Sequence, residues 1–497
     1  MQVGGDRGNG GCFAAAAVVE GNSQSRFQGR LELNVWSRAH AGPGWRLKES
    51  PFRLCTVAAN NCKLQPQVCF VGSMAVRCFR RHRSLGTGLL LVVLMTSLAM
   101  LLSCLSGPIH QRHPQEILVP LSCAQHPPAE QESNASQNAS GKARACRPKV
   151  DIMFLKTHKT ASSTVLNILL RFGEKHGLRI ALPHGRNDFF YPRPFERGQV
   201  EGYRPGLCFN IIGSHMRFDA AEVARLLPPQ AAYITILRDP ARVFESSFHY
   251  YGRLVPLTWT IPGRDKLAEF LRQPRRYYRP GGYNAFFLHN LQLFDLGYDH
   301  ALGPEDSQVG LAISHIEQRF QLVLLAEHFE ESLVLLRDAL CWEAEDLQFF
   351  RLNMRKEAAV SPLSAEQRER ARQWNGADWR LYRHFNASFW ARVEAFGHAR
   401  MRREVQELRQ RNRRLADACI EGGFAVEPTR IRDPYMQPWQ PVGEHSIMGY
   451  NLRQDVDEAQ RQLCLRMLTP EIQYLSLLGG DLWITQLWGH IRHLINW

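Results

Sequence analysis

Apolar residues form one long run near the first fifth of the chain. No charged residue occurs between positions 85 and 105, and four arginines, Arg77, Arg80, Arg81 and Arg83, come just before this stretch. As a helix it would be about 31 Å long, enough to cross the hydrocarbon core of a bilayer. The basic flank predicts a cytoplasmic N-terminal side and places the C-terminal bulk across the membrane. A cleaved signal peptide is the alternative, but its apolar core is usually only ~7–15 residues long.

Four shorter apolar runs predict buried strands. They lie at residues 150–155, 209–212, 232–237 and 321–325. Helical patterns separate them, and strands that alternate with helices are typical of a parallel sheet covered by helices on both faces. The sequence therefore predicts an α/β fold.

The first predicted helix is amphipathic and runs from about Ser163 through His176, with Gly177 as its C-cap. A second helical stretch follows residues 238–240 and continues through Tyr251. In parallel sheets, ligands bind at the carboxyl ends of the strands. The candidate site therefore lies in the loops that begin at Lys156, Gly213 and Arg238.

Two patterns in the C-terminal part are less specific. From residue 378 toward 414 a long polar helix is expected, with glutamate and arginine alternating near its end. We interpret it as a solvated supporting helix rather than a nucleic-acid-binding arm. The last segment, 475–497, places Trp483, Trp488 and Trp497 among leucines and isoleucines. This pattern fits either packing into the core or an amphipathic surface at a membrane interface, where tryptophan is favoured.

Composition divides the chain into five parts. Residues 1–73 are glycine-rich at the start and show no sustained apolar period, so we expect a disordered extension or an upstream-start artefact and assign no function to it. A basic tail at 74–84 precedes the expected transmembrane signal-anchor at 85–105. Residues 106–148 are rich in Pro, Gln, Ser and Ala, which predicts a stem that builds no core. The globular domain is expected at 149–497.

Glycosylation sequons and cysteines agree with this topology. Asn134, Asn138 and Asn386 each begin an Asn-Ala-Ser sequon, and all three follow the expected span. Six cysteines also follow it, an even number that suits disulfides in an oxidising lumen: Cys123, Cys146, Cys208, Cys341, Cys419 and Cys464. No CxxC pair or His/Cys cluster with zinc spacing occurs in the sequence, so no metal is expected.

The net charge excludes few classes of binding partner. The formal charge of +14 suits a polyanionic ligand, a nucleic acid or an anionic membrane surface. A non-catalytic binder of heparin-like polyanions is one such class, but it does not explain why cations cluster at the ends of two predicted strands. A hydrophobic content of 44% argues against wholesale disorder.

The strongest local signal is a loop of cations and hydroxyls between the first strand and the first helix. It reads Leu-Lys-Thr-His-Lys-Thr-Ala-Ser-Ser-Thr at 155–164. Free N–H groups and the positive dipole at a helix start favour phosphate, and Lys156 and Lys159 add charge. The Walker pattern GxxxxGK[ST] is absent. An ordinary Ser/Thr helix cap needs neither two lysines nor a histidine, so the loop predicts an anion site.

A second anion-binding signal follows the strand at 232–237. Arg238 stands at the strand end, and Ser246 comes about two helical turns later. A guanidinium can hold a phosphate with two hydrogen bonds, and a serine hydroxyl can add another. Two anion clamps on adjacent strand ends suit a nucleotide with phosphates at its 5′ and 3′ positions.

These two segments resemble the donor-binding motifs of Golgi sulfotransferases, and more narrowly of the galactose 3-O-sulfotransferases. The blocks that carry the resemblance span about residues 73–497: FLKTHKTASST, GRNDF, YRPG, CFNII, HMRF, SSFHY, VPLTW, YRHFNASFW, MQPWQP and LTPEIQYL. The resemblance implies a P-loop-like sulfotransferase fold in the Golgi lumen, anchored by a single span. It also implies 3′-phosphoadenosine-5′-phosphosulfate (PAPS) as the sulfuryl donor and a galactose 3-hydroxyl as the acceptor. The likeness is greatest to glycolipid-acting members, so a galactolipid is the expected acceptor and glycoprotein or oligosaccharide chains are the alternative.

Carried over by position, the resemblance assigns the residues of the donor site. Arg238 and Ser246 correspond to the pair on the 3′-phosphate. The grip on the 5′-phosphosulfate corresponds to Lys159, Thr160, Ala161, Ser162, Ser163 and Thr164. Ala161 departs from the wider superfamily, where glycine is common, and its methyl group would restrict how closely the backbone approaches phosphate.

Sulfuryl transfer needs in-line positioning, charge stabilisation and removal of the acceptor proton. Lys159 and Lys156 are expected to stabilise the leaving phosphate. Histidine suits the base near neutral pH, and the candidates are His158 and His215. The position of His215, where related uronosyl sulfotransferases carry their base, favours it and leaves His158 to contact donor or acceptor, but the choice stays open.

The acceptor side is less defined in the sequence. Asp188 could bond acceptor hydroxyls or serve a turn. Candidates to pack on the sugar or lipid are the aromatic residues Phe189, Phe190, Tyr191, His249 and Tyr250.

Overall fold

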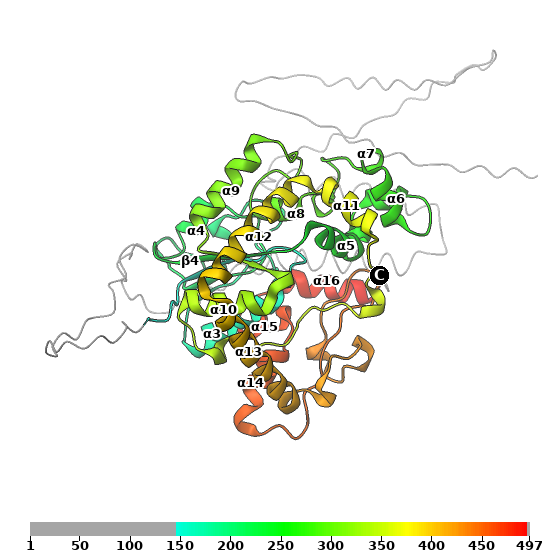
Figure 1. Cartoon of the computed structure of the whole chain (residues 1–497). Helices are drawn as coiled ribbons and strands as arrows, with labels where there is room; N and C mark the ends of the chain where they lie inside the picture. The colour runs from blue at the N-terminus through cyan, green and yellow to red at the C-terminus, as the bar shows by residue number, and fades with distance from the viewer. Residues whose placement is uncertain (1–145, 495–497) are drawn as a thin grey trace, which may run out of the picture. The chain divides into compact units, whose positions relative to one another are not determined.

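The computed structural model describes residues 146–494, which Figure 1 shows in colour. The expected tail, span and most of the stem, together with Asn134, Asn138 and Cys123, lie outside the described residues. Within residues 146–494, no helix is both long enough and apolar enough to cross a membrane.

A five-stranded parallel sheet forms the centre of the domain, with strand order β2-β3-β1-β4-β5. The predicted α/β fold and all four predicted strands are confirmed. The strands are β1 Ile152–Leu155, β2 Ile180–Ala181, β3 Ile211–Ile212, β4 Ala232–Leu237 and β5 Leu322–Leu325. The two-residue strand β2 was not predicted, because two residues carry no periodic pattern.

Helices cover both faces of the sheet, with α3 and α10 on one side and α4 and α9 on the other (Figure 1). All residues of β1 and β5 are buried, as expected for strands covered on both faces. The α-helices are α3 Ser162–Lys175, α4 Ala220–Ala224, α5 Pro240–Tyr251, α6 Lys266–Arg272, α7 Pro274–Tyr277, α8 Leu291–Asp295, α9 Ser307–Arg319, α10 Phe329–Leu340, α11 Ala365–Trp374, α12 Gly376–Phe396, α13 His398–Cys419, α14 Glu458–Leu468, α15 Glu471–Leu477 and α16 Trp483–Leu494.

The first helix matches its prediction closely. α3 begins at Ser162 and ends at Lys175, and Gly177 adopts a φ of 60° just beyond it. That left-handed conformation suits glycine, whose N–H bonds the carbonyl of Glu174 at the end of the helix. β1, its loop and α3 therefore form the expected strand–loop–helix unit.

The expected helical stretch from residue 378 to 414 is confirmed, but its polar, solvated character is wrong for its first part. It is two helices, α12 and α13, that meet at Gly397, whose φ is 93°. α12 is a core helix rather than a solvated one, because apolar side chains recur at every fourth position and are buried: Leu381, Phe385, Phe389 and Val393. The sequon residue Asn386 lies half-buried within α12.

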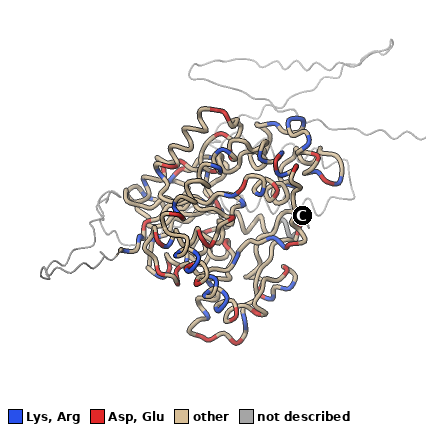
Figure 2. Tube along the Cα trace, viewed as in Figure 1, with Lys and Arg blue, Asp and Glu red and all other residues tan. Residues whose placement is uncertain are grey.

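The outer face of α13 agrees with the predicted solvated role. It carries many arginines and a few acidic residues (Figure 2), and some of the arginines form ion pairs along and across the helix. Arg400 pairs with Glu404 and Asp338, and Arg411 pairs with Glu407 and Glu345. These pairs connect α13 to neighbouring segments through its solvated face.

Disulfides tie the domain together, as the cysteine count predicted. Cys146 is bonded to Cys341 at the end of α10, and Cys419 of α13 to Cys464 of α14, with Cα–Cα distances of 5.7 and 5.2 Å. Cys208 is disulfide-bonded as well. The first two bonds join residues 195 and 45 positions apart and so restrict the unfolded chain.

One part of the C-terminal segment packs into the core, and another part is exposed. Leu475 and Leu482 are buried in the main core, which fits core packing. Trp483 and Trp488 of α16 are 54% and 52% exposed, so core packing is wrong for these two side chains. Trp497 lies outside the described residues.

Candidate functional site

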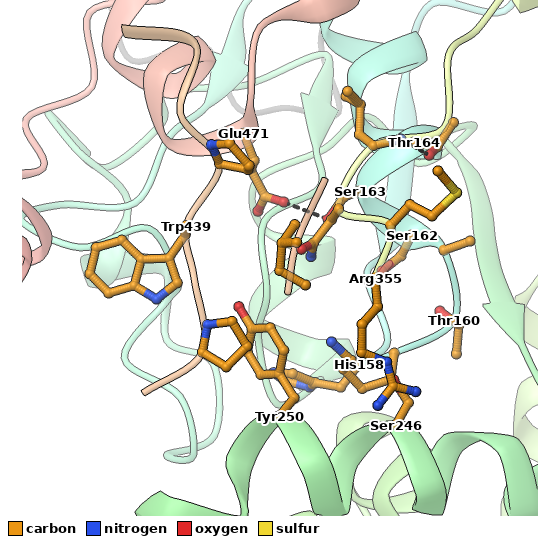
Figure 3. Close-up of a pocket in the computed structure, with 18 of the residues that line it drawn as sticks. His158, Thr160, Ser162, Ser163, Thr164, Ser246, Tyr250, Arg355, Trp439 and Glu471 are labelled. Carbon is orange, nitrogen blue, oxygen red and sulfur yellow. Dashed lines mark hydrogen bonds between the residues drawn. The ribbon is translucent and has the colours of Figure 1, made fainter. Parts of the chain in front are cut away.

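A cavity of about 1000 Å³ opens at the carboxyl ends of β1, β3 and β4. The three loops expected from the sequence meet there and contribute Lys156, His215 and Arg238 to its wall. C-terminal segments at 351–355 and 436–450 line the cavity as well. Figure 3 shows side chains from these separate parts of the chain pointing toward one space.

The loop after β1 turns through two left-handed residues, Lys159 and Ala161, with φ of 60° and 65°. Ala161 is the N-cap of α3 and offers no capping side chain. The left-handed region costs an L-residue about 1–2 kcal/mol, and glycine avoids this cost. The sequence departure at Ala161 therefore strains the backbone. Its predicted effect on phosphate approach stays a prediction.

Hydroxyl groups of this loop bind protein atoms. Thr160 Oγ1 and Ser162 Oγ donate to the carbonyl of Thr157 at 3.1 and 2.7 Å. Ser163 Oγ donates to Glu471 Oε2 at 2.8 Å (Figure 3), and Thr164 Oγ1 accepts from the backbone N–H of Leu352 at 3.1 Å. These bonds hold the loop in shape, and the same residues line the cavity, so their predicted contacts with the 5′-phosphosulfate stay predictions.

Lysine ammonium groups crowd the cavity wall. Lys159 Nζ lies 3.5 Å from the ring centroid of Tyr250. Burial, followed by repulsion from Arg355, Arg238 and Lys156, holds the pKa of Lys159 well below its usual range. Burial also lowers the pKa of Lys156, although the nearby carboxylate of Glu471 opposes that shift. A bound anion would relieve this repulsion, so the wall is electrostatically suited to one.

Arg238 joins the two predicted anion clamps. Its Nη1 donates to the carbonyl of Lys159 at 2.9 Å, and its backbone N–H donates to Gln292 Oε1 at 2.8 Å. Burial lowers the pKa of Arg238. Ser246, on α5, lines the same cavity (Figure 3). The structure thus brings both predicted clamps to one wall.

Two histidine rings stack in the cavity, and His158 is bound to a buried carboxylate. Its ring lies 3.9 Å from that of His215, at an interplanar angle of 11°. Asp295 is completely buried and bonds both the backbone N–H of His158, at 2.7 Å, and His158 Nδ1, at 2.9 Å. Tyr191 Oη donates to the same carboxylate at 2.8 Å. Because an ionised carboxylate only accepts, Nδ1 of His158 carries a proton, and in the neutral ring Nε2 then carries the lone pair.

His215 has a different environment. Its Nδ1 donates to the backbone carbonyl of Lys156 at 2.9 Å, and its Nε2 accepts from Lys156 Nζ at 2.5 Å. Lys156 Nζ in turn lies 3.1 Å from Glu471 Oε2. Burial, then the charges of His158 and Lys156, holds the pKa of His215 well below its usual range. Both ring nitrogens of His215 are thus engaged, and the ring is neutral.

Comparison with known proteins places the chain in a family. The family model described as galactose-3-O-sulfotransferase matches residues 74–482. The chain belongs to this family. The resemblance seen in the sequence motifs is thereby confirmed.

Relatives of this galactose-3-O-sulfotransferase are similar over most of its length. Galactosylceramide sulfotransferase of Bos taurus is 55% identical over 419 residues, which are 84% of this chain and 99% of that protein. The Homo sapiens protein of that name is 54% identical over 83% of this chain and 98% of its own length. Galactose-3-O-sulfotransferase 2 of Homo sapiens is 45% identical over 67% of this chain and 83% of its own length. A solved sulfotransferase from Alicyclobacillus acidocaldarius aligns with 49% of this chain and 99% of that one at 15% identity. Its TM-score of 0.28 is too low to support a structural comparison.

Of the residues that the sequence predicts to contact the acceptor, some line the cavity and others do not. Asp188 makes the bonds expected of a turn, since Oδ1 accepts from the backbone N–H of Tyr191 at 3.0 Å and Oδ2 pairs with Arg186 at 3.1 Å. It also lines the cavity, so contact with an acceptor stays a prediction. Phe189 is fully buried and packs edge-to-face on Phe195, so its candidacy as a sugar contact is wrong. Among the predicted aromatic residues, the cavity is lined by Tyr191, His249 and Tyr250.

Sequence reasoning did not find two cavity residues, Glu471 and Arg355, nor the buried Asp295 that bonds His158. Asp295 was an isolated acid in an apolar run, which is a detectable sign of a buried carboxylate. Glu471 lies in the LTPEIQYL block, but nothing in the block indicates its role. Arg355 bonds both oxygens of Glu245, at 2.8 and 2.6 Å, and gave no sequence signal.

One group of potential metal ligands lies outside the cavity wall. Ligand atoms of His184, Glu201 and Asp481 lie within 4.8 Å of one another. His184 and Asp481 are exposed and Glu201 is half-buried. Exposed acidic groups commonly lie together without a metal, so we assign none to this family member.

Proposed function

We propose that the protein transfers the sulfuryl group of PAPS to the 3-hydroxyl of galactose in galactosylceramide and related galactolipids. The observation that carries this proposal is the crowding of cations on one cavity wall, where Arg238 Nη1 bonds the carbonyl of Lys159 at 2.9 Å. Two linked anion clamps suit a donor with a 5′-phosphosulfate and a 3′-phosphate. Relatives named for galactosylceramide are 54–55% identical, against 45% for galactose-3-O-sulfotransferase 2, which favours the glycolipid acceptor.

For the chemical step we propose His158 as the base. The acceptor oxygen attacks sulfur as His158 Nε2 takes its proton, and the bond from sulfur to the departing phosphate oxygen breaks. Asp295 stabilises the imidazolium that forms, while Lys159 and Lys156 stabilise the charge on the departing phosphate. The products are a galactose 3-sulfate ester and adenosine 3′,5′-bisphosphate.

This assignment departs from the preference for His215 that its position suggested. In the geometry above, both ring nitrogens of His215 are already bonded, at 2.9 and 2.5 Å. We propose that His215 instead holds Lys156 in place.

We also propose that residues 85–105 anchor the protein in the Golgi membrane as a single span, with the domain in the lumen. The support is the uncharged run with its basic flank, together with the disulfides Cys146–Cys341 and Cys419–Cys464. Disulfides persist in oxidising compartments.

The test is transfer from labelled PAPS to three acceptors by the full chain in detergent. The acceptors are galactosylceramide, lactosylceramide and a soluble N-acetyllactosamine oligosaccharide, with linkage analysis of each product. We expect 3-O-sulfation of galactosylceramide with the highest kcat/KM. Transfer to the soluble sugar alone would move the function to glycoprotein glycans, and absence of transfer to all three would refute the proposed activity.

A further inference from the structure

The C-terminal helix α16 has an apolar face that is largely exposed, although Trp483 and Ile484 also lie against Gly185 at one end of it. At 3.6 residues per turn, Trp483, Ile484, Leu487, Trp488 and Ile491 fall within an arc of about 140°. We call these five residues the apolar face of α16. Trp483, Leu487 and Trp488 are 54%, 50% and 52% exposed, and the two isoleucines are half-buried.

The side of α16 that meets the protein is made of small residues. Thr485 is buried, and Gly489 lies against the indole of Trp439, where a Cβ would come within 3.4 Å of the ring. A surface helix ordinarily turns its apolar stripe toward the core. In α16 this arrangement is reversed, which indicates an apolar partner outside the domain.

This helix lies beside the cavity. The backbone N–H of Ile484 donates to the carbonyl of Gly185 at 2.9 Å, and that of Asn187 donates to Thr485 Oγ1 at 3.0 Å. Asn187 and Trp439 both line the cavity. One end of α16 therefore contacts one part of the cavity wall, and its middle contacts another.

We propose that the apolar face of α16 binds the surface of the lipid bilayer that carries the acceptor. The helix has 12 residues, about 18 Å, and is too short to span a bilayer but long enough to lie in its interface. Tryptophan suits that depth, because its ring is apolar and its N–H is polar.

The choice of a bilayer rests on the proposed function, since a galactolipid acceptor keeps its chains in the membrane while its sugar enters the cavity. The segment that the family model matches ends at Leu482, one residue before α16. The helix thus lies just beyond the part of the chain that the family model matches.

The test compares a membrane acceptor with a soluble one. The full chain is reconstituted into phosphatidylcholine vesicles containing galactosylceramide, and a water-soluble lactoside is assayed in parallel. The triple variant Trp483→Ser/Leu487→Ser/Trp488→Ser should raise the apparent KM for vesicle galactosylceramide by about tenfold or more, because it removes apolar area from the interface. The KM and kcat for the lactoside should stay unchanged.

The matched control is Trp259→Ser, which removes an indole that is 61% exposed but lies on the 3₁₀ segment η5 (Pro256–Thr260). It should leave both KM values unchanged. Equal losses on both acceptors, or no loss on either, would overturn the membrane proposal. A change in oligomeric state of the triple variant would overturn it in favour of a second copy of the chain. If the unmodified chain sulfates neither acceptor, the proposed function itself fails, which the lactoside arm distinguishes.

Discussion

His158 and His215 lie ring on ring in one cavity, yet their hydrogen bonds differ in kind. His158 Nδ1 binds the buried carboxylate of Asp295 at 2.9 Å. His215 Nδ1 binds a backbone carbonyl, and its Nε2 accepts from the ammonium group of Lys156 at 2.5 Å. A carboxylate behind the ring stabilises the protonated form, whereas an ammonium in front of it opposes that form. The residue type and its position in the sequence are therefore not enough to identify the base. The hydrogen-bond partner of each ring nitrogen is needed as well.

Of the substitutions at these two histidines, the removal of His158 should have the larger effect on kcat. We expect His158→Ala to lower kcat by about 10²–10⁴-fold, because the acceptor proton loses its base. The dissociation constant of adenosine 3′,5′-bisphosphate, measured by calorimetry, should change little, since the lysines and Arg238 remain. Turnover close to that of the unmodified protein would transfer the role of base to another group.

Asp295→Asn should remove the charge that distinguishes the environment of His158 from that of His215. The substitution keeps the shape of the side chain but removes the charge that stabilises a protonated ring, so kcat should fall by about 10²-fold. The acidic limb of the kcat/KM profile should also move to lower pH. Asp295→Glu, which keeps the charge, should recover part of the rate. A loss of thermal stability with an unmoved pH profile would show a purely structural role for Asp295.

His215→Ala should have a smaller effect, about tenfold on kcat/KM. The reason is indirect: Lys156 loses one of the groups that place its ammonium beside the departing phosphate. The dissociation constant of adenosine 3′,5′-bisphosphate should rise in this variant, unlike in His158→Ala. Equal losses of turnover in the two alanine variants, with donor affinity intact in both, would contradict the distinction drawn here.

The sheet could be predicted because strands covered on both faces appear in the sequence as continuous apolar runs. β4 was predicted at its observed bounds, and β1 and β5 within two residues. β2 was missed, since it has only two residues. α12 was misjudged because the charges that follow it obscured its apolar side chains at every fourth position.

The cations of the candidate site were predictable for a local reason: each follows a strand end, and parallel strand ends meet at one edge of the sheet. The long-range partners of the residues in the loop after β1 were not. Asp295 is 137 residues from His158, and Glu471 is 308 residues from Ser163. Such pairs have no spacing rule, and only the complete fold brings them together.

The smallest expected effect concerns how stability depends on pH. Burial lowers the pKa of His215 well below the ordinary 6.5, so between these two values the unfolded chain binds a proton that the folded protein does not. This difference makes the folded state lose stability as the pH falls below about 6.5. The free energy of unfolding should therefore be lower at pH 5.5 than at pH 7.5. Urea unfolding of His215→Gln, compared with the unmodified protein at pH 7.5 and 5.5, should show a correspondingly weaker dependence on pH. Parallel behaviour of the two proteins would mean that the folded protein accepts a proton on His215, and the contrast with His158 would then lose its electrostatic basis.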